Sequence, residues 1–429
     1  MAGLGTLLAV RPRAADPRTV IGLWSQTVAF DRTGDRVLVG GRGSGAALAP
    51  SGPGVPVAGG SSSLPEHALQ PGTRLLRGVA DTHPTAAAAR EFLHVSQSWL
   101  SARPEPLRDL ARSALLDLWV LSEGLPAPVA AWSESWRYIW PRDAAFCAVA
   151  LARVGHGDRA MDALLHLQSL QAADGWFEAR YDPASGRRPD ARTRQLDGTG
   201  LLLWAAEEVL TAASPADLGG LRTGLSPLIE RSTALLLDAT GAGCTLPPVT
   251  PDYWELREKH VTLWTMAATL RGLRAASALR ADPDVDDAAD GFETLLRGSF
   301  GTHGYQRHRS GGGEDSALAL FDATGLHDVV PAPQLRALRT VLARPGGGIA
   351  PGAAWRQDGV SWTPSTSLLC LGLARSGQDG PAREVLTWLS EHRTAAGSLP
   401  EKVLFDGRPA EVAPLAWTAA NVLLAIDAL

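Results

Sequence analysis

Apolar residues recur at helical spacing along most of this chain. From about residue 83 onward they repeat every three or four positions in segment after segment, with short polar loops between the segments. The pattern predicts a leading helix at about 84–101. Twelve further helices are predicted at about 106–123, 142–154, 157–171, 197–211, 219–239, 259–280, 284–298, 314–323, 332–343, 364–376, 380–392 and 414–428.

The beginning of the chain has a different pattern. The stretch TVIGLWSQTVAFDRTGDRVLVGG alternates apolar and polar residues around DRTGD, which predicts a small β-hairpin. The stretch that follows, GRGSGAALAPSGPGVPVAGGSSSLPEH, is rich in Gly, Pro and Ser and predicts a loop or linker. We therefore divide the chain into an N-terminal hairpin and linker region, 1–82, and a helical domain, 83–429.

Twelve helices of similar length, joined by alternating short and long loops, suggest six helical hairpins. If the hairpins close into a ring, they form an (α/α)6 toroid in which six inner helices are surrounded by six outer ones. The expected fold class is therefore all-α, with a short N-terminal β and loop extension. An open solenoid or a globular array of helices is the alternative, although no solenoid repeat of fixed period is visible.

The toroid predicts that every second helix is an inner one and that the N-terminal ends of the inner helices share one face. The segments before the even-numbered helices are polar, aromatic or rich in Gly, whereas the others are plainer. They read YIWPRD, RTRQLDGTG, DYWELREKH, HRSGGGED, QDGVSWTPS and SLPEKVLFDGRPAEVAP. Since a flat indole ring matches the apolar face of a sugar ring, tryptophan beside charge at this rim suggests a carbohydrate site.

Charge and cysteine content narrow the function classes. The formal net charge is −5, which does not indicate binding to nucleic acid or to an anionic membrane. No stretch approaches the ~20 apolar residues that span a bilayer. The three cysteines are scattered without a Cys/His cluster, so no disulfide framework or structural zinc site is expected. The oligomeric state is open.

The compartment is also open from the sequence. The N-terminus MAGLGTLLAVRPRAADP has a short apolar run, but the basic residues that precede such a run in a signal peptide are missing. The default is a cytoplasmic protein. Export is expected if this segment is a truncated signal peptide.

Two glutamates could supply glycoside hydrolysis. An inverting hydrolase needs one protonated carboxyl group to donate to the leaving oxygen and one ionised carboxylate to activate water. Glu255 directly follows Trp254, and burial against an aromatic ring would raise its pKa. Glu401 lies in the loop LPEK and could meet Glu255 only in a folded ring. This chemistry needs no redox cofactor and no catalytic metal.

Four motifs resemble glycoside hydrolase family 15. RYIWPRDAAF, QLDGTG, DYWELR with HVTLW, and SLPEKV with PLAW recur in this order in that family, over about residues 105–429. The family contains glucoamylases, glucodextranases and a trehalase branch. The resemblance implies a hydrolase that releases β-glucose from the non-reducing end of α-glucosides. A trehalase-type hydrolase and a non-catalytic sugar-binding protein on the same scaffold are the alternatives.

The resemblance also implies roles for single residues. Glu255 would be the general acid, with Trp254 walling the site and Arg257 nearby, and Glu401 would be the general base. The residues that would bind the glucose unit or line its pocket are Trp140, Arg142, Asp143, Asp197 and Trp417. Simpler interpretations stay open for several of these residues: a helix-start ion pair, a helix cap, a surface ion pair or a core tryptophan.

Overall fold

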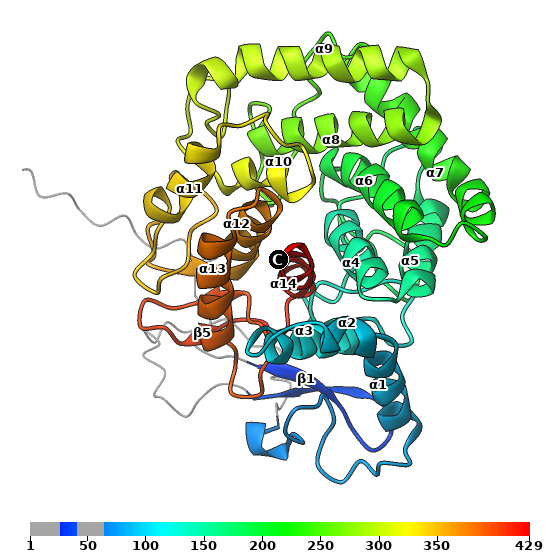
Figure 1. The fold of residues 1–429 in the computed structure, drawn as a ribbon, viewed down its shortest axis with the longest axis vertical. Helices are drawn as coiled ribbons and strands as arrows, with labels where there is room; N and C mark the ends of the chain where they lie inside the picture. Colours follow the sequence, from blue (N-terminus) through cyan, green and yellow to red (C-terminus); the bar gives the residue numbers. More distant parts are fainter. Residues whose placement is uncertain (1–25, 41–63) are drawn as a thin grey trace, which may run out of the picture.

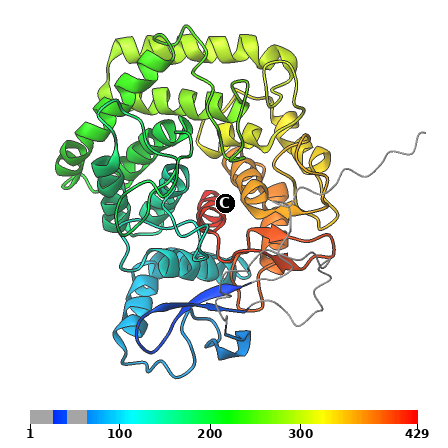
Figure 2. The ribbon, with the colours of Figure 1, turned by 180° about the vertical axis from the view of Figure 1, so that it is seen from behind.

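The computed structural model describes residues 26–40 and 64–429. The signal-like N-terminus and most of the Gly-, Pro- and Ser-rich stretch lie outside the described residues. Helices dominate the described chain and close into a ring, seen from its two faces in Figures 1 and 2.

Six helices form the inner ring. α4 packs on α6, α6 on α8, α8 on α10, α10 on α12 and α12 on α14, and the ring closes where α14 packs on α4 (Figure 1). Their sequences are apolar on nearly every side, as expected for helices surrounded by other helices. The inner helices are α4 (Pro141–Arg153), α6 (Asp197–Ala212), α8 (Leu263–Arg280), α10 (Ala319–Ala323), α12 (Thr363–Arg375) and α14 (Ala416–Ala428).

The outer helices are amphipathic and cover the inner ring. In α13 the buried residues Ala382, Val385, Leu386 and Leu389 follow helical spacing, so one stripe faces α12 and the other faces water. The outer helices are α3 (Leu107–Ser122), α5 (Gly157–Leu170), α7 (Leu218–Ala239), α9 (Pro283–Ser299), α11 (Ala332–Val341) and α13 (Asp379–Glu391). The prediction of an (α/α)6 toroid, with every second helix inside, is confirmed.

Glycine allows two inner helices to approach closely. A Cβ atom at Gly200 of α6 would lie 2.1 Å from the carbonyl oxygen of Ala268 on α8. A Cβ atom at Gly272 of α8 would lie 2.6 Å from the Cα atom of Gly200. Only residues without a side chain fit at positions 200 and 272, and this lets the first turn of α6 pack closely on the middle of α8.

Three helix boundaries differ from the prediction. The leading helix is divided into α1 (Pro84–Val95) and α2 (Gln97–Ser101) by Ser96, whose hydroxyl donates to the carbonyl of Val154 at 2.9 Å. The helix predicted from 259 begins at Leu263, because Thr262 caps it and forms a β-bridge with His308. The helix predicted at 314–323 is a 3-10 turn, η4 (Ser316–Leu318), followed by the short α10.

The N-terminal extension contains the predicted hairpin. β1 (Thr27–Phe30) pairs antiparallel with β2 (Arg36–Val39), and the part of the predicted stretch before residue 26 lies outside the described residues. A 3-10 turn, η2 (Glu66–Ala68), follows. In Figure 1 the extension lies beside α3, and the ring of Phe30 contacts that of Trp119 with centroids 5.0 Å apart.

A small sheet was not predicted. β3 (Ser361–Trp362), β4 (Lys402–Val403) and β5 (Pro409–Ala410) form an antiparallel sheet in the order β3-β4-β5. Its register sets Trp362 opposite Lys402. A further 3-10 turn, η3 (Gly301–His303), follows α9. The sheet therefore joins the segment before α12 to the segment that carries Glu401.

Candidate active site

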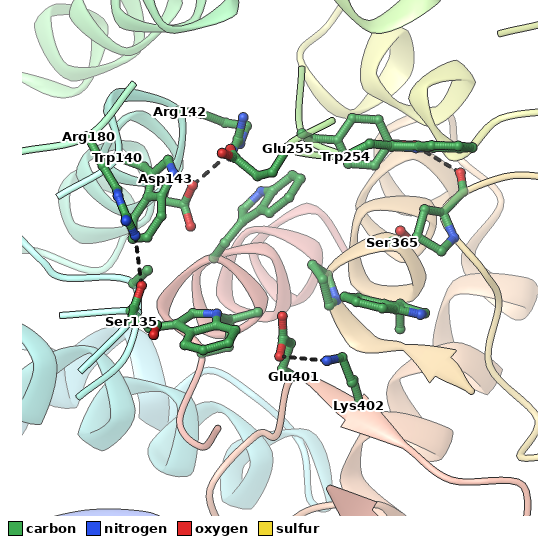
Figure 3. Close-up of a pocket in the computed structure, with 18 of the residues that line it drawn as sticks. Ser135, Trp140, Arg142, Asp143, Arg180, Trp254, Glu255, Ser365, Glu401 and Lys402 are labelled. Atoms are coloured by element: carbon green, nitrogen blue, oxygen red, sulfur yellow. Dashed lines mark hydrogen bonds and ion pairs between the residues drawn. The ribbon is translucent and has the colours of Figure 1, made fainter. Parts of the chain in front are cut away.

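A cavity opens at the N-terminal ends of the inner helices. Its volume is about 270 Å³, slightly below the ~300–1,000 Å³ of common small-molecule sites. Arg142 and Asp143 enter it from the first turn of α4, and Trp417 enters it from the first turn of α14. Figure 3 shows Arg142 and Asp143 with the two glutamates, Glu255 and Glu401, which lie on different sides of the cavity. The N-terminal rim of the ring therefore carries the pocket, as the toroid predicted.

Tryptophan is the most frequent residue in the wall. Six indole rings line the cavity: Trp136, Trp140, Trp254, Trp355, Trp362 and Trp417. In five of them the indole nitrogen is buried and has no hydrogen-bond partner among the described residues; these are Trp140, Trp254, Trp355, Trp362 and Trp417. Because buried N–H groups are nearly always paired in proteins, the wall offers donors to a polar ligand with an apolar face.

Arg142 is the hub of the site. Its Nη1 donates to Gln195 and to Asp197, each at 3.0 Å, and its Nη2 donates to Glu255 at 2.8 Å. The guanidinium is buried and lies 5.7 Å from the ring centroid of Trp417. With so many bonds, Arg142 is fixed in one orientation before any ligand arrives.

Asp197 does not line the pocket, which corrects the expectation from the sequence. It begins α6, is almost fully buried, and accepts from Trp264 at 2.7 Å as well as from Arg142. It lies beneath Arg142 and supports it.

Asp143 faces the cavity beside Arg142. Its Oδ2 lies 3.4 Å from the Nε of Arg142 and has no hydrogen-bond partner among the described residues. Burial raises the pKa of Asp143 to about 6, although the positive charge of Arg142 opposes the shift. This oxygen is available to accept a hydrogen bond from a ligand hydroxyl.

Glu255 is held by donors on both carboxylate oxygens. Its Oε1 accepts from Arg142 at 2.8 Å and from Gln195 at 3.0 Å, and its Oε2 accepts from Arg192 at 2.8 Å. Burial would raise the pKa of Glu255, but the charges and hydrogen bonds of these neighbours outweigh it and lower the pKa. The raised pKa expected from the neighbouring Trp254 is therefore wrong.

Trp254 is occupied by a different partner. The guanidinium of Arg307 lies 3.5 Å from its ring centroid, and the ring of Trp355 packs against its edge. Arg307 is itself buried among acids, with Nη1 2.8 Å from Asp315 and Nη2 3.0 Å from Asp252. This second charged cluster fixes the indole as a wall of the cavity, and Glu255 turns away from it with a positive φ of 55°.

Glu401 lies in less polar surroundings. Its backbone N–H donates to Val412 at 2.8 Å and its carbonyl accepts from Thr363 at 3.0 Å, so the segment is fixed on both sides. The Nζ of Lys402 lies 3.4 Å from its Oε2 (Figure 3). Burial raises the pKa of Glu401, Lys402 opposes the shift, and Glu411 adds to it.

Most of the candidate residues meet in this one cavity. Trp140, Arg142, Asp143, Trp254, Glu255, Glu401 and Trp417 all line it. Arg257 does not, which corrects the second expectation: its side chain is exposed and lies outside the cavity lining. Arg192, from the loop before α6, takes the place beside Glu255.

Several lining residues were missed from the sequence. They are Trp136, Arg180, Arg192, Trp355, Trp362 and Lys402. Arg192 and Trp362 stand in junction segments that the pattern had already marked, so their position before an inner helix was the usable signal. Arg180 lies in the loop after α5 and stacks on Trp140 with its guanidinium 5.0 Å from the ring centroid.

The described residues contain neither a cluster of metal-binding side chains nor a helix that could span a membrane. In the described ranges, 26–40 and 64–429, no group of three or more His, Cys, Asp or Glu side chains could hold a metal ion. Among the helices of these ranges, none is long and apolar enough to cross a membrane.

Comparisons with known proteins identify the fold. No family model matches the chain, and no curated protein sequence matches it. A glycosidase variant in complex with glucose is similar over 75% of this chain and 96% of its own, with a TM-score of 0.61 and 24% identity. A bacterial glucoamylase complexed with acarbose is similar over 77% and 57%, with a TM-score of 0.62 and 16% identity.

A third solved structure extends the comparison. A GH63 mannosylglycerate hydrolase from Thermus thermophilus, in complex with Tris and D-glycerate, is similar over 73% of this chain and 99% of its own. Its TM-score is 0.54 and its identity 17%. The chain thus has the α/α toroid fold found in these glycosidases.

Proposed function

We propose that this protein is an inverting glycoside hydrolase that releases β-glucose from the non-reducing end of α-glucosides. The observation that carries the proposal is the cavity itself. It sets two carboxyl groups, Glu255 and Glu401, on different sides of a pocket walled by tryptophans with unpaired indole donors. An apolar wall with inward polar groups suits a sugar ring, and two carboxyl groups suit hydrolysis of its glycosidic bond.

The terminal glucose is held at the Arg142 side. Asp143 accepts from sugar hydroxyls through its unpaired Oδ2, and Arg142 donates to them. The bonds from Arg142 to Asp197 and Gln195 pre-organise this grip, so that binding costs little side-chain entropy. Trp140 and Trp417 supply apolar faces for the ring.

Glu255 is the general acid in this proposal. Its Oε2 is held by Arg192, whose side chain is 40% exposed, whereas its Oε1 is held by buried Arg142. The exposed contact is the weaker one, because water screens it. When the glycosidic oxygen displaces Arg192 from Oε2 of Glu255, a positive charge is removed and the pKa of Glu255 rises. Oε2 then carries the proton that is transferred to the glycosidic oxygen and leaves with the aglycone.

Glu401 is the general base. It accepts a proton from the water that attacks the anomeric carbon, and Lys402 at 3.4 Å favours the ionised form that this step needs. Loss of the proton from water, attack on the sugar and protonation of the leaving oxygen by Glu255 together give inverted glucose and the free alcohol.

The resemblance of the four motifs to glycoside hydrolase family 15 supports this assignment at the level of single residues. The fold shared with a bacterial glucoamylase that was solved with acarbose supports the substrate class. The linkage that we propose the protein cleaves is α-1,4 or α-1,6.

A second candidate function is a non-catalytic sugar-binding protein on the same scaffold. One observation favours it: the donors around Glu255 lower its pKa, and an ionised carboxylate cannot protonate a leaving group. In that function the same aromatic pocket would bind glucose units without cleaving them.

Proton NMR of the purified protein with maltotriose, isomaltotriose and trehalose separates these functions. The proposal expects β-glucose as the first product, and the sugar that disappears identifies the linkage. Early α-glucose would overturn the inverting mechanism. Saturation-transfer contacts to a sugar that stays intact would support the non-catalytic function, and consumption of trehalose alone would indicate a trehalase-type hydrolase.

A further inference from the structure

The segment that leads to Glu401 is held from outside the inner ring. Residues 394–399 run along α3 and the N-terminal extension before the chain enters the cavity at Glu401. Leu399 donates its backbone N–H to Oδ2 of Asp117 on α3 at 2.9 Å, and Ser113 of α3 donates to the carbonyl of Gly397. Since Leu399 is two residues from Glu401, these bonds act close to the proposed base.

Asp117 is in turn held by the N-terminal extension. Nε and Nη2 of Arg74 donate to its Oδ1 at 2.9 and 2.7 Å, and both side chains are almost fully buried. The same guanidinium donates to the carbonyl of Ala396 at 3.2 Å. One arginine of the extension therefore bonds both to the segment before Glu401 and to the acid that holds that segment.

Two more contacts join the extension to the same segment. The hydroxyl of Thr27 in β1 is hydrogen-bonded to that of Ser398, and both side chains are fully buried. Ala396 packs on the apolar cluster formed by Ala29, Val39 and Leu69. The hairpin thus contacts the chain just before the cavity, although it lines no part of the cavity itself.

We propose that the N-terminal extension positions the general base: Arg74 and Asp117, assisted by Thr27, fix the segment 394–399 and so place Glu401. The inference rests on the proposed function, in which Glu401 is the base. Proton abstraction from water depends on sub-ångström placement of the carboxylate, so a loosened segment slows turnover while sugar binding at Arg142 and Asp143 persists. Arg74 and Asp117 are positioning residues, because neither reaches the sugar.

The test variant replaces the pair together. Removal of Arg74 alone leaves a buried, unpaired carboxylate and threatens folding, whereas an apolar pair of similar size is often tolerated. We therefore combine Arg74→Met with Asp117→Leu, which removes the acceptor of the Leu399 amide. Thr27→Val, which is nearly isosteric, is a second and milder variant that removes the hydrogen bond to Ser398 in the same segment.

Arg36→Met is the matched control. Arg36 also belongs to the extension and also bonds α3, through the carbonyls of Val120 and Glu123. Its guanidinium stacks on Phe30 and Trp132, and its hydrogen bonds go to the end of α3 rather than to 394–399. It therefore reports what the extension contributes by general attachment.

Kinetics on an α-glucoside give the first readout. The double variant is expected to lose kcat by about 10- to 100-fold with KM within about twofold of wild type. Thr27→Val is expected to show a smaller loss in the same direction, and Arg36→Met to keep kcat within about twofold. Wild-type kcat in the double variant, or an equal loss in Arg36→Met, would overturn the inference.

Amide hydrogen exchange gives a readout that does not need activity. The double variant is expected to lose protection in peptides that cover 395–403 and to keep it in peptides that cover 141–150, and Arg36→Met is expected to keep both. If the wild-type protein hydrolyses no α-glucoside, the proposed function fails, yet this exchange pattern still decides whether the extension fixes the segment. Unchanged protection at 395–403 would overturn the positioning role by itself.

Discussion

The two sides of the pocket treat their carboxyl groups in opposite ways. On one side Glu255 is 27% exposed, and arginine bonds to both of its oxygens, so its pKa is lowered. On the other side Glu401 is buried with one lysine at 3.4 Å, and its pKa is raised. Burial alone would raise both pKa values, so the number of cations in contact decides the difference.

The directions of these two pKa shifts run against the proposed roles. The proposed acid is the ionised group, and the proposed base is the group with the raised pKa. The pKa directions alone would make Glu401 the acid and Glu255 the base. The proposed roles therefore require substrate binding to change the surroundings of at least one carboxyl group, and Arg192 is the neighbour with the most exposed side chain.

The largest expected effect is that of Glu401→Gln. Loss of the general base is expected to lower kcat by about 100- to 10,000-fold on every α-glucoside, whatever the leaving group. Binding of a sugar at Arg142 and Asp143 is expected to persist, because the amide keeps the shape of the side chain. Steady-state kinetics with isothermal titration of the substrate measure both quantities, and a variant with wild-type turnover would remove Glu401 from the mechanism.

Glu255→Gln is expected to depend on the leaving group. The fall in kcat should reach about 100-fold or more for an oligosaccharide, whose leaving oxygen needs a proton. It should be small for an aryl glucoside with a nitro-substituted ring, whose phenolate leaves without protonation. The two glutamine variants assayed on both substrates decide the roles: if Glu401→Gln shows the dependence on the leaving group instead, the roles are exchanged.

Lys402→Met is expected to move the acidic limb of the pH–rate profile. Lys402 opposes the rise in the pKa of Glu401, so its loss raises that pKa further. The base then stays protonated up to higher pH, and activity on the acidic side is lost while the alkaline limb stays in place. Profiles of kcat/KM for the variant and the wild type test this, and a shift of the alkaline limb would identify Glu401 as the acid.

Arg192→Met is expected to move the opposite limb. Arg192 helps to lower the pKa of Glu255, so its loss raises that pKa and keeps the acid protonated to higher pH. The alkaline limb should move upward by less than one unit, because the cation is 40% exposed and screened by water. Arg257→Met, which changes an arginine outside the cavity, is the control and should leave both limbs unchanged.

The smallest expected effect is on stability. A carboxyl group whose pKa is lowered in the folded state stabilises the protein above its ordinary pKa, and this stabilisation is lost as pH falls. A carboxyl group whose pKa is raised stabilises the protein at low pH, and this stabilisation is lost as pH rises. At pH 7, Glu255→Gln should therefore lower Tm and Glu401→Gln should raise it, each by about 1–2 °C. Thermal unfolding at pH 7 and pH 4 measures both, and changes of the same sign would contradict the contrast.

The fold could be predicted because its signal is local and repeated. Apolar residues at helical spacing define each helix, and the polar and aromatic segments before every second helix indicate which ones are inside. The strands β3, β4 and β5 escaped because two-residue strands leave no alternation to detect. The split at Ser96 also escaped, since its cause is a bond to Val154 far along the chain.

The surroundings of Glu255 could not be predicted, because the side chains that contact it in the fold are not the ones next to it in the sequence. Trp254 precedes Glu255 but is covered by Arg307, and Arg257 follows at two residues but faces solvent. The arginine that bonds to Oε2 of Glu255 comes from the loop before α6. The sequence motif therefore indicated Glu255 as a candidate, but the residues next to it in sequence could not predict the direction of its pKa shift.

The closure of the ring has a consequence for the order in which the pocket comes into being. α14 packs on both α3 and α4, and it brings Trp417 to the cavity already lined by Arg142. During synthesis Arg142 and Asp143 on α4 are made early, while Glu401 and Trp417 are made late. Until α14 is made, the ring is open, and α3, α4 and α12 lack the contacts that α14 makes with them.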